Sequence, residues 1–328
     1  MADLTGKNVL FFSPRFFNYE VEIQNALIQA GANVMWFDER PSNSFTTKVI
    51  IRLYKKLIKQ KIARYFESVL KQVLDSGVCI DFILIISPET ITPKQLKDFK
   101  MKFKNAKIIL YMWDSLKNKG AIDLLSIVDS AITFDPRDAE KFNLKLHPLF
   151  YIDQYKFKNC EQYYELLFIG TAHSDRYNFV KGITANLPDS KTKLFFFLSS
   201  KKLYWSKRFF DKDFKNVKLE DISFDSLTHI ETVELMQRSQ VILDVNHPEQ
   251  IGLTMRTFET LGAQKKLITT NQDIVRYDFY DENNIMVIDR VKPFICSEFI
   301  MKPFKPSSKD ILEKYSIHGW LNELFKGS

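Results

Sequence analysis

The chain has 328 residues, of which 45% are apolar and 27% are charged. This is the composition of a folded globular protein, and it excludes wholesale disorder, collagen and disulfide-rich scaffolds. A domain holds roughly 100–200 residues, so the length predicts two domains. The three cysteines, Cys79, Cys160 and Cys296, are scattered without zinc or disulfide spacing, which fits free thiols in a reducing cytosol.

Neither a secretory signal nor a membrane-spanning segment is expected. The start of the chain, MADLTGKNVLFF, carries an acid at position 3 and only a four-residue apolar run. The longest apolar runs are strand-sized, far below the roughly 20 residues that cross a bilayer. We therefore expect a cytoplasmic protein. The basic residues described next add the expectation that it attaches peripherally to the inner face of the cytoplasmic membrane.

The net charge of +7 comes from one interval, residues 48–72, which we call the basic segment. It contains eight Lys or Arg residues and a single acid, Glu67. Its apolar residues recur at helical spacing, which predicts a basic amphipathic helix or helix pair. Such a face can bind anionic lipid headgroups, or it can be the solvated outer side of a helix packed on a core. Nucleic acid is not an expected partner, because no binding module is recognisable.

Short β-rich runs alternate with helical patterns along the first half of the chain. We predict strands at 9–12, 33–37, 80–86, 107–112 and 130–134. We predict helices at 20–30, over the basic segment, from about residue 93 and from about residue 121. Such alternation favours a parallel sheet covered by helices on both faces.

The same pattern restarts after a loop at 153–161. Predicted strands are 166–169, 194–198, 241–245 and 267–270, and predicted helices are 176–186, 229–237 and 253–261, with a final amphipathic helix at 308–325. The fold class is therefore α/β, with two doubly wound domains at 1–152 and 153–306 and a C-terminal helix at 307–328. Ligands bind beyond the carboxyl ends of the strands in such sheets, so we expect the site in a cleft between the two halves.

The segment 241–271, VILDVNHPEQIGLTMRTFETLGAQKKLITTN, is the most informative stretch. A buried strand ends at Asp244, and Gly252 is predicted to open a helix that carries Arg256 and Glu259 on one face. A helix N-terminus and a forked guanidinium suit phosphate, and a carboxylate can accept hydrogen bonds from ribose hydroxyls. The alternative is an ordinary ion pair on a helix surface.

Two stretches resemble a known family. The run GLTMRTFETLGA followed by KLITTN resembles the donor-binding helix of GT-B glycosyltransferases, most closely the lipopolysaccharide, capsule and spore-maturation types. The resemblance implies two Rossmann-like domains facing across a cleft, with Arg256 on the donor diphosphate and Glu259 on the ribose. The run LLFIGTAHSDRY looks like the first strand–helix turn of the donor domain, which places Gly170, Thr171 and Arg176 beside the phosphates.

The likeness covers residues 164–290 and is weak over the first half of the chain. Many retaining members carry two Glu residues eight positions apart, whereas here Glu249 precedes Glu259 by ten. The resemblance therefore leaves both the stereochemistry and the role of Glu249 open.

The first half must supply the acceptor side. An inverting transfer needs a base near the acceptor hydroxyl. Asp114, directly after a predicted strand, is the first candidate, and Glu20 is the second, near Ser13 and Arg15. The alternatives are a helix N-cap for Asp114 and a first-turn helix acid for Glu20. His173 can stabilise the leaving diphosphate or can be a plain loop residue.

No metal or cofactor is expected. Asp211 and Asp213 form a D-x-D pattern, but it lies in the charged stretch 206–216, which we predict to be a solvated loop. The histidines show no ligand spacing. Walker-A, G-x-G-x-x-G and G-x-S-x-G motifs are absent from the sequence. Arg256 and a nearby lysine, Lys265 or Lys266, then have to neutralise the leaving diphosphate.

The sequence thus predicts a metal-independent glycosyltransferase that moves a sugar from a nucleoside-diphosphate donor to a surface glycan. The acceptor is expected to be lipid-linked lipopolysaccharide, O-antigen or capsule material. Two alternatives stay open: a nucleotide-sugar epimerase of the same fold, and a non-catalytic adaptor that binds membrane or nucleic acid through the basic segment.

Overall fold

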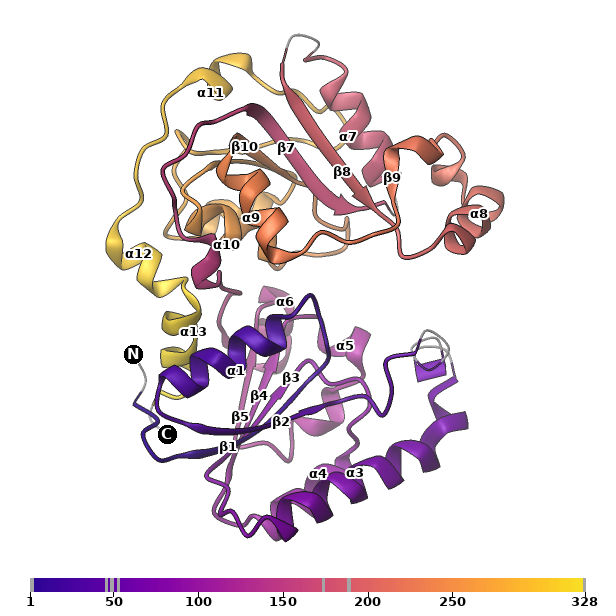
Figure 1. Ribbon diagram of the computed structural model, residues 1–328, viewed down its shortest axis with the longest axis vertical. Helices are drawn as coiled ribbons and strands as arrows, with labels where there is room; N and C mark the ends of the chain where they lie inside the picture. Colours follow the sequence, from indigo (N-terminus) through magenta and orange to yellow (C-terminus); the bar gives the residue numbers. More distant parts are fainter. Residues whose placement is uncertain are drawn as a thin grey trace. The chain divides into compact units, whose positions relative to one another are not determined.

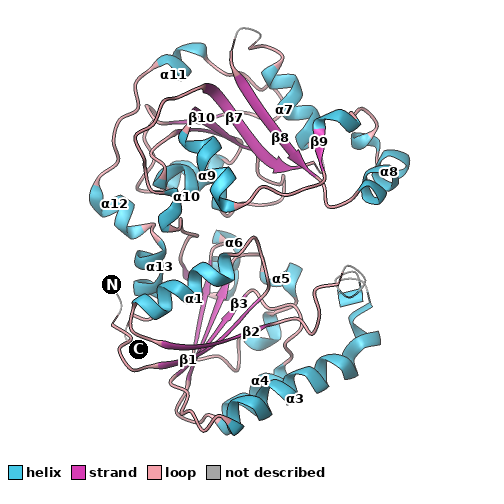
Figure 2. Cartoon of the chain, in the orientation of Figure 1, coloured by secondary structure: helices cyan, strands magenta, loops and turns pink. Residues whose placement is uncertain are grey.

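The computed structural model describes residues 3–44, 47, 50–51, 54–172, 175–187 and 190–326. The chain divides into two compact units: unit 1 is Met1–Pro148 with Ile317–Ser328, and unit 2 is Leu149–Ser316. Each unit contains a six-stranded sheet in which every strand pair is parallel, with helices packed around it (Figures 1 and 2). The predicted α/β class with two doubly wound domains is confirmed.

The sheet of unit 1 has the order β2-β1-β3-β4-β5-β6. Its strands are β1 (Asn8–Ser13), β2 (Asn33–Asp38), β3 (Phe82–Ile86), β4 (Lys107–Met112), β5 (Ser130–Thr133) and β6 (Lys145–Leu146). Its helices are α1 (Tyr19–Gln29), α3 (Lys59–Asp75), α4 (Pro93–Lys102), α5 (Leu116–Lys119), α6 (Pro136–Phe142) and α13 (Ile317–Leu324). β3 reads FILII and is buried throughout, as expected for a strand covered on both faces.

Helix α3 contains most of the basic segment that the structure describes. Its apolar side packs into the core of unit 1 through Ile62, Phe66, Val69 and Val73. Its exposed residues include Lys59, Lys61, Arg64 and Lys71. Lys55–Ile58 form a 3-10 turn, while residues 48, 49, 52 and 53 and the side chains of Lys55 and Lys56 lie outside the described part. The solvent-exposed side of α3 therefore carries mainly charged side chains.

The end of the chain differs from the single predicted helix at 308–325. It forms α12 (Lys309–Lys314) in unit 2 and α13 in unit 1, separated at Tyr315 and Ser316. The separation has a local cause, because the Tyr151 N–H donates to the Tyr315 carbonyl at 3.0 Å and Tyr151 bridges to Ser316. In α13, Trp320 meets the ring of Tyr111 edge-on at 4.9 Å. The domain boundaries predicted at 152 and 306 thus differ from this division chiefly in where the tail belongs.

The sheet of unit 2 has the order β12-β11-β10-β7-β8-β9. Its strands are β7 (Tyr164–Thr171), β8 (Thr192–Phe197), β9 (Ile222–Ser223), β10 (Ser239–Asp244), β11 (Lys266–Thr269) and β12 (Ile285–Val287). Besides α12, its helices are α7 (Arg176–Thr184), α8 (Lys201–Phe210), α9 (His229–Gln237), α10 (Met255–Gly262) and α11 (Ser297–Met301).

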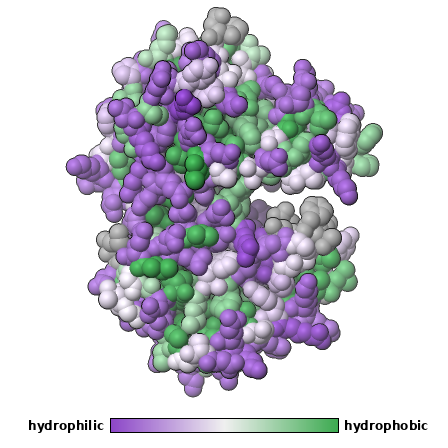
Figure 3. All heavy atoms as spheres, in the orientation of Figure 1, coloured by the Kyte–Doolittle hydropathy of each residue, from purple (hydrophilic) through white to green (hydrophobic). Residues whose placement is uncertain are grey.

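Two further predictions of local structure are wrong. The stretch 206–216 is not a loop: it contains the second half of α8 and a 3-10 turn at Lys212–Phe214. In Figure 3, hydrophobic and hydrophilic residues lie side by side on the surface of the region where Figure 1 places α8. The helix expected from residue 121 is only a 3-10 turn, Ile122–Leu124, preceded by α5, which ends at Gly120 with φ 65°. Among the described residues, no helix is long and apolar enough to span a bilayer.

Candidate functional site

The topology of unit 2 marks one edge of its sheet. β7 is the first strand of the unit and lies between β8 and β10, so the strand order reverses between β7 and β10. In doubly wound sheets, ligands bind beyond the carboxyl ends of the strands at this switch point. The two strands end at Thr171 and Asp244. The predicted donor residues that contact these two strand ends are therefore the ones placed to reach such a ligand.

Arg176 is the first residue of α7 and turns back onto the end of β7. Its Nη1 lies 3.0 Å from Thr171 Oγ1 and 3.4 Å from the Thr171 carbonyl oxygen. Burial, together with the nearby Arg290 charge, lowers the pKa of Arg176, while the carboxylates of Asp244 and Asp175 oppose that shift. Its Nε is buried and has no hydrogen-bond partner among the described residues. A buried N–H without a partner is costly, and an anionic oxygen would satisfy it.

The start of α10 is fixed to the end of β10. Asp244 Oδ2 accepts hydrogen bonds from the hydroxyls of Thr254, at 2.6 Å, and Thr257, at 3.0 Å. Burial raises the pKa of Asp244, and these two bonds and the charges of Arg176 and Arg256 oppose the rise. Thr254 is the N-cap and accepts from the Thr257 N–H. The helix therefore begins after Gly252, which lies in the preceding loop and accepts a hydrogen bond from Gln250 Nε2.

Arg256 and Glu259 pair with each other inside unit 2. Arg256 Nη1 is 2.5 Å from Glu259 Oε2, and their side chains are only 18% and 5% exposed. Tyr155 lies beside them: burial and the Glu259 charge raise the pKa of Tyr155, whose hydroxyl is 3.2 Å from His229 Nδ1. The pair is thus buried among polar groups, unlike the surface ion pair considered as the alternative.

Arg290, which the sequence analysis missed, also lies at this edge. It hydrogen-bonds the carboxylate of Asp175 and the backbone carbonyl of Asn246, and its guanidinium lies 5.7 Å from the ring centre of Phe179. It follows β12, a three-residue strand too short to be predicted from its pattern. Asn246, two residues after β10, also receives a hydrogen bond from the Thr270 hydroxyl. Arg290 therefore links the loops that follow β7, β10 and β12.

Gly170 has a packing explanation of its own. A Cβ at this position would come within 2.7 Å of the Phe168 ring. Residues two apart in a strand share a face, so the ring of Phe168 occupies the space that a side chain at 170 would need. His173 lies outside the described residues, so its predicted role is not addressed by the structure.

The lysines predicted to help the leaving diphosphate lie elsewhere. Lys266 begins β11, and the amino ends of parallel strands lie at the sheet edge opposite the switch point. Lys265 donates to the Gln237 carbonyl at 2.6 Å, and Lys266 donates to the Phe299 carbonyl. The prediction for both lysines is wrong, because each ammonium is buried and occupied by a backbone oxygen.

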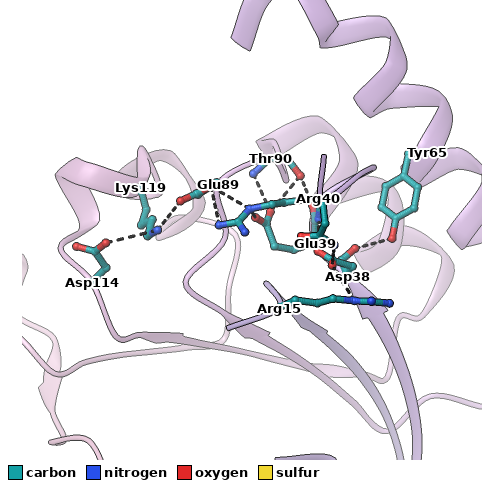
Figure 4. Close-up of polar contacts among 10 residues, drawn as sticks. Arg15, Asp38, Glu39, Arg40, Tyr65, Glu89, Thr90, Asp114 and Lys119 are labelled. Atoms are coloured by element: carbon teal, nitrogen blue, oxygen red, sulfur yellow. Dashed lines mark hydrogen bonds and ion pairs between the residues drawn. The ribbon is translucent and has the colours of Figure 1, made fainter. Parts of the chain in front are cut away.

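In unit 1 the strand order reverses between β1 and β3, and a chain of ion pairs follows the strand ends (Figure 4). Glu89 lies at its centre, with Oε2 2.9 Å from Arg40 Nη2 and Oε1 2.5 Å from Lys119 Nζ. Lys119 also reaches Asp114 Oδ2 at 3.4 Å. Burial alone would raise the pKa of Glu89, but Lys119 and Arg40 outweigh it and hold the pKa below its usual range.

The same chain continues to Glu39, whose side chain is fully buried. Its Oε2 accepts from the Thr90 N–H at 2.8 Å and from the Thr90 hydroxyl at 3.0 Å. Burial raises the pKa of Glu39, although the Thr90 N–H and the Arg40 charge oppose the rise. Glu39, Arg40 and Glu89 were missed by the sequence analysis. Their position directly after predicted strands was the signal that could have found them.

Asp114 remains accessible at the end of this chain, with 40% of its side chain exposed. Its Oδ1 accepts from the Ser115 N–H at 2.8 Å, while the N-cap of α5 is Ser115 itself, so Asp114 is not the cap. Glu20 is buried, and its Oε2 accepts from the Phe16 N–H at 3.0 Å, which favours a structural role. Ser13 accepts from the Trp36 indole N–H at 2.9 Å, and Arg15 lies 3.6 Å from the Asp38 carboxylate.

Two other features bear on the site. No three His, Cys, Asp or Glu side chains among the described residues are grouped to hold a metal ion, and Asp211 instead caps the turn at Lys212–Phe214. Unit 2 also contains a cavity of about 520 Å³ between α8 and residues 215–220, and another of about 510 Å³ between α9 and the loop before β7, away from the switch point. The lining residues of the latter are Gln154, Lys158, Cys160, Glu161, Ile230, Val233, Glu234, Gln237 and Arg238.

No family model and no curated protein matches the sequence. Solved structures do match along nearly its whole length. HepE from Anabaena, solved with UDP and glucose, has a TM-score of 0.60 at 11% identity over 97% of this chain and 98% of its own. AviGT4, a glycosyltransferase involved in avilamycin A biosynthesis, has a TM-score of 0.56 at 9% identity over 97% and 95%. The UDP-GlcNAc 2-epimerase from Methanocaldococcus jannaschii has 0.51 at 10% identity over 98% and 99%.

At such low identity these similarities show the fold alone. They agree with two six-stranded parallel sheets, one in each unit, and with the resemblance seen in the sequence. The chain therefore has the GT-B fold of two Rossmann-like domains.

Proposed function

We propose that this protein is a glycosyltransferase that takes a sugar from a nucleoside-diphosphate donor bound at the switch point of unit 2. The observation that carries the proposal is the buried Nε of Arg176, which lacks a partner among the described residues and lies where a donor diphosphate binds in Rossmann-like sheets. HepE, which shares the fold, was solved in complex with UDP-glucose, and this supports a nucleotide-sugar donor.

The donor contacts follow from the strand ends. Thr171, Arg176 and the N-terminus of α10 bind the diphosphate, with Gly170 and Gly252 as backbone neighbours. Arg256 turns to the phosphates, and Glu259 exchanges its bond with Arg256 for the ribose hydroxyls. The positive charges of Arg176, Arg256 and Arg290 stabilise the diphosphate as it leaves, so the transfer needs no metal.

Unit 1 supplies the acceptor side in this proposal. Asp114 is the base: its carboxylate takes the proton of the acceptor hydroxyl while that oxygen attacks the anomeric carbon, and the nucleoside diphosphate leaves with the electron pair of the broken bond. Its partial exposure and its contact with Lys119 support this role, whereas Glu20 is the weaker candidate. The acceptor we propose is a lipid-linked surface glycan at the inner face of the cytoplasmic membrane, in keeping with the exposed charges of α3.

An epimerase is the second candidate, because the UDP-GlcNAc 2-epimerase has the same fold along 98% of this chain. Incubation with donor alone separates the two reactions. An epimerase changes the sugar without an acceptor, whereas a transferase leaves the donor intact or hydrolyses it slowly. Nuclear magnetic resonance of the sugar gives the readout.

A thermal-shift panel of nucleoside diphosphates and nucleotide sugars tests the donor site. A ligand that binds only the folded protein raises its melting temperature, so at least one member of the panel should do so. The rise should shrink in Glu259→Ala and stay in Arg276→Ala, whose guanidinium is on a side chain that is 76% exposed. A panel without any rise would contradict donor binding and favour a non-catalytic adaptor.

A further inference from the structure

Helix α8 of unit 2 presents three aromatic side chains to solvent. Trp205, Phe209 and Phe210 are 48%, 74% and 88% exposed. Single exposed apolar residues are ordinary, but large apolar side chains gathered on one short helix indicate a contact surface. Figure 1 shows α8 away from the sheet of its unit, beyond β9.

The outward position of these rings is fixed by the opposite side of the helix. Tyr204 is buried, and its hydroxyl donates to the Val217 carbonyl at 2.8 Å. Arg208 Nη1 donates to the carbonyls of Lys215 and Val217, both at 2.9 Å. Ser200 caps the N-terminus by accepting from the Leu203 N–H. Because α8 is held in this way, its aromatic side cannot turn inward without breaking these bonds.

Basic residues border the rings. Residues four apart lie on one helix face, so Lys201, Trp205 and Phe209 form one stripe and Lys202, Ser206 and Phe210 form the next. Each stripe begins with a lysine and ends with a phenylalanine.

The surrounding charge is positive. Residues 201–220 contain seven Lys or Arg and three acids. Of the acids, Asp211 lies 3.4 Å from Lys207 and Glu220 lies 3.8 Å from Lys218, while Asp213 is exposed. The exposed cations include Lys212 and Lys215 in addition to the two lysines of the stripes. The surface therefore combines a net positive charge with protruding aromatic rings.

We propose that α8 and the segment up to residue 220 bind the surface of an anionic phospholipid membrane. The rings of Trp205, Phe209 and Phe210 enter the headgroup region, where aromatic side chains are favoured, and the lysines contact lipid phosphates. Charge complementarity selects an anionic surface over a neutral one. A single-stranded nucleic acid is bound in a groove lined by aromatic rings, and it fits less well here. The hollow of about 520 Å³ beside α8 is lined by Trp205 but not by Phe209 or Phe210, the two most exposed rings.

This surface differs from helix α3 of the basic segment, which buries its apolar side in the core of unit 1. The residues before α3 also expose apolar side chains, Tyr54 at 61% and Leu57 at 77%, so the two surfaces have to be tested separately. The α8 surface is also independent of the donor site, so its test does not depend on the proposed reaction.

The test is co-sedimentation of the full chain with vesicles of phosphatidylglycerol and phosphatidylcholine, compared with vesicles of phosphatidylcholine alone. The double variant Phe209→Ser with Phe210→Ser should bind the anionic vesicles at least tenfold more weakly. The matched control is Phe294→Ser, which removes an exposed ring elsewhere in unit 2 (71% exposed) and should bind within twofold of the parent protein. Vesicles should shift the tryptophan emission to the blue, and Trp205→Phe should remove most of that shift.

Unchanged vesicle binding by the double variant would overturn the proposal. So would loss of binding on charge reversal at Lys59, Lys61 and Arg64 alone, tighter binding to single-stranded RNA than to vesicles, or a dimer that the double variant dissociates. Nucleoside-diphosphate binding measured on the same samples keeps the two proposals apart. If vesicles are bound and nucleotides are not, only the proposed function fails.

Discussion

The switch points of the two sheets are built from the same kinds of side chain in different arrangements. In unit 1, Glu89 is held by Arg40 and Lys119, and Lys119 extends to Asp114, so the cations there are occupied by carboxylates. In unit 2, Arg176 leans on a neutral threonine and keeps a buried N–H without a partner among the described residues. The continuous ion pairs of unit 1 make its side chains rigid and orient the exposed carboxylate of Asp114. The guanidinium of Arg176 still has a hydrogen-bond donor that can bind an anion. The difference suits an acceptor hydroxyl in unit 1 and a diphosphate in unit 2.

The largest expected effect is on turnover and comes from unit 1. Asp114→Asn removes the proposed base, so kcat should fall by about 100-fold or more while the donor Kd stays unchanged. Steady-state kinetics and calorimetry measure the two quantities. Asp123→Asn, an equal change of charge at an exposed position in the same unit, should leave both unaffected. A kcat within twofold of the parent would contradict the assignment of Asp114 as the base.

The next effect is on donor affinity and comes from unit 2. Arg176→Ala removes the proposed charge-assisted hydrogen bonds to the diphosphate, so the Kd for the nucleoside diphosphate should rise by about 10–100-fold, at about 1.5–3 kcal/mol for such a bond. Lys119→Ala, which removes a cation from the other switch point, should leave this Kd unchanged. Calorimetric titration of both variants measures the two Kd values. Equal losses of affinity would contradict the assignment of donor binding to unit 2 alone.

A smaller effect concerns stability and acid pH. Because the pKa of Glu89 is lowered in the folded protein, its ion pairs stabilise the fold at pH values above the ordinary 4.5, and this contribution is lost as the pH falls through the lowered pKa. Glu89→Gln should reduce the free energy of unfolding at pH 7 by about 1–3 kcal/mol and flatten its decline in acid. Urea unfolding across the pH range gives the measurement. Glu234→Gln, at a surface ion pair with a 65% exposed carboxylate, should change little.

The smallest effect separates packing from binding at Gly170. A Cβ there would press on the end of the Phe168 ring, which can shift, so Gly170→Ala should cost about 1 kcal/mol of stability. If packing is the whole reason for the glycine, the melting temperature falls and the donor Kd does not change. A rise in Kd at unchanged stability would instead place this backbone against the phosphates.

Much of the fold could be predicted, because long buried strands appear in the sequence as continuous apolar runs. The run at 107–112 is apolar from its second residue on and forms β4 with the predicted bounds, and α9 at His229–Gln237 also has its predicted bounds. The edge strands β6 and β9 have two residues each, too few for any period to show. Helix α8 was missed for a different reason. Tyr204 is its buried residue, and the exposed aromatic and basic residues around it do not form the apolar–polar pattern of an amphipathic helix.

The candidate site was predictable where a residue directly follows a long apolar strand. Asp114 is of this kind. Gly170, Thr171 and Arg176 came from the family resemblance alone, and Arg256 and Glu259 came from a helical spacing joined to that resemblance. Arg290 had no such signal, since the strand before it has only three residues. The pairing of Glu89 with Arg40 and Lys119 joins residues 49 and 30 positions apart, and only tertiary structure reveals it.

During synthesis on the ribosome, unit 1 stays incomplete while all of unit 2 is being made. Trp320 and Phe325, which cover Tyr111 and Phe82, emerge only after residues 149–316, a delay of roughly ten to thirty seconds at about 5–20 residues per second. Until then these apolar surfaces of the nascent first unit are open to chaperones, whereas unit 2 is contiguous in the chain and can finish folding first.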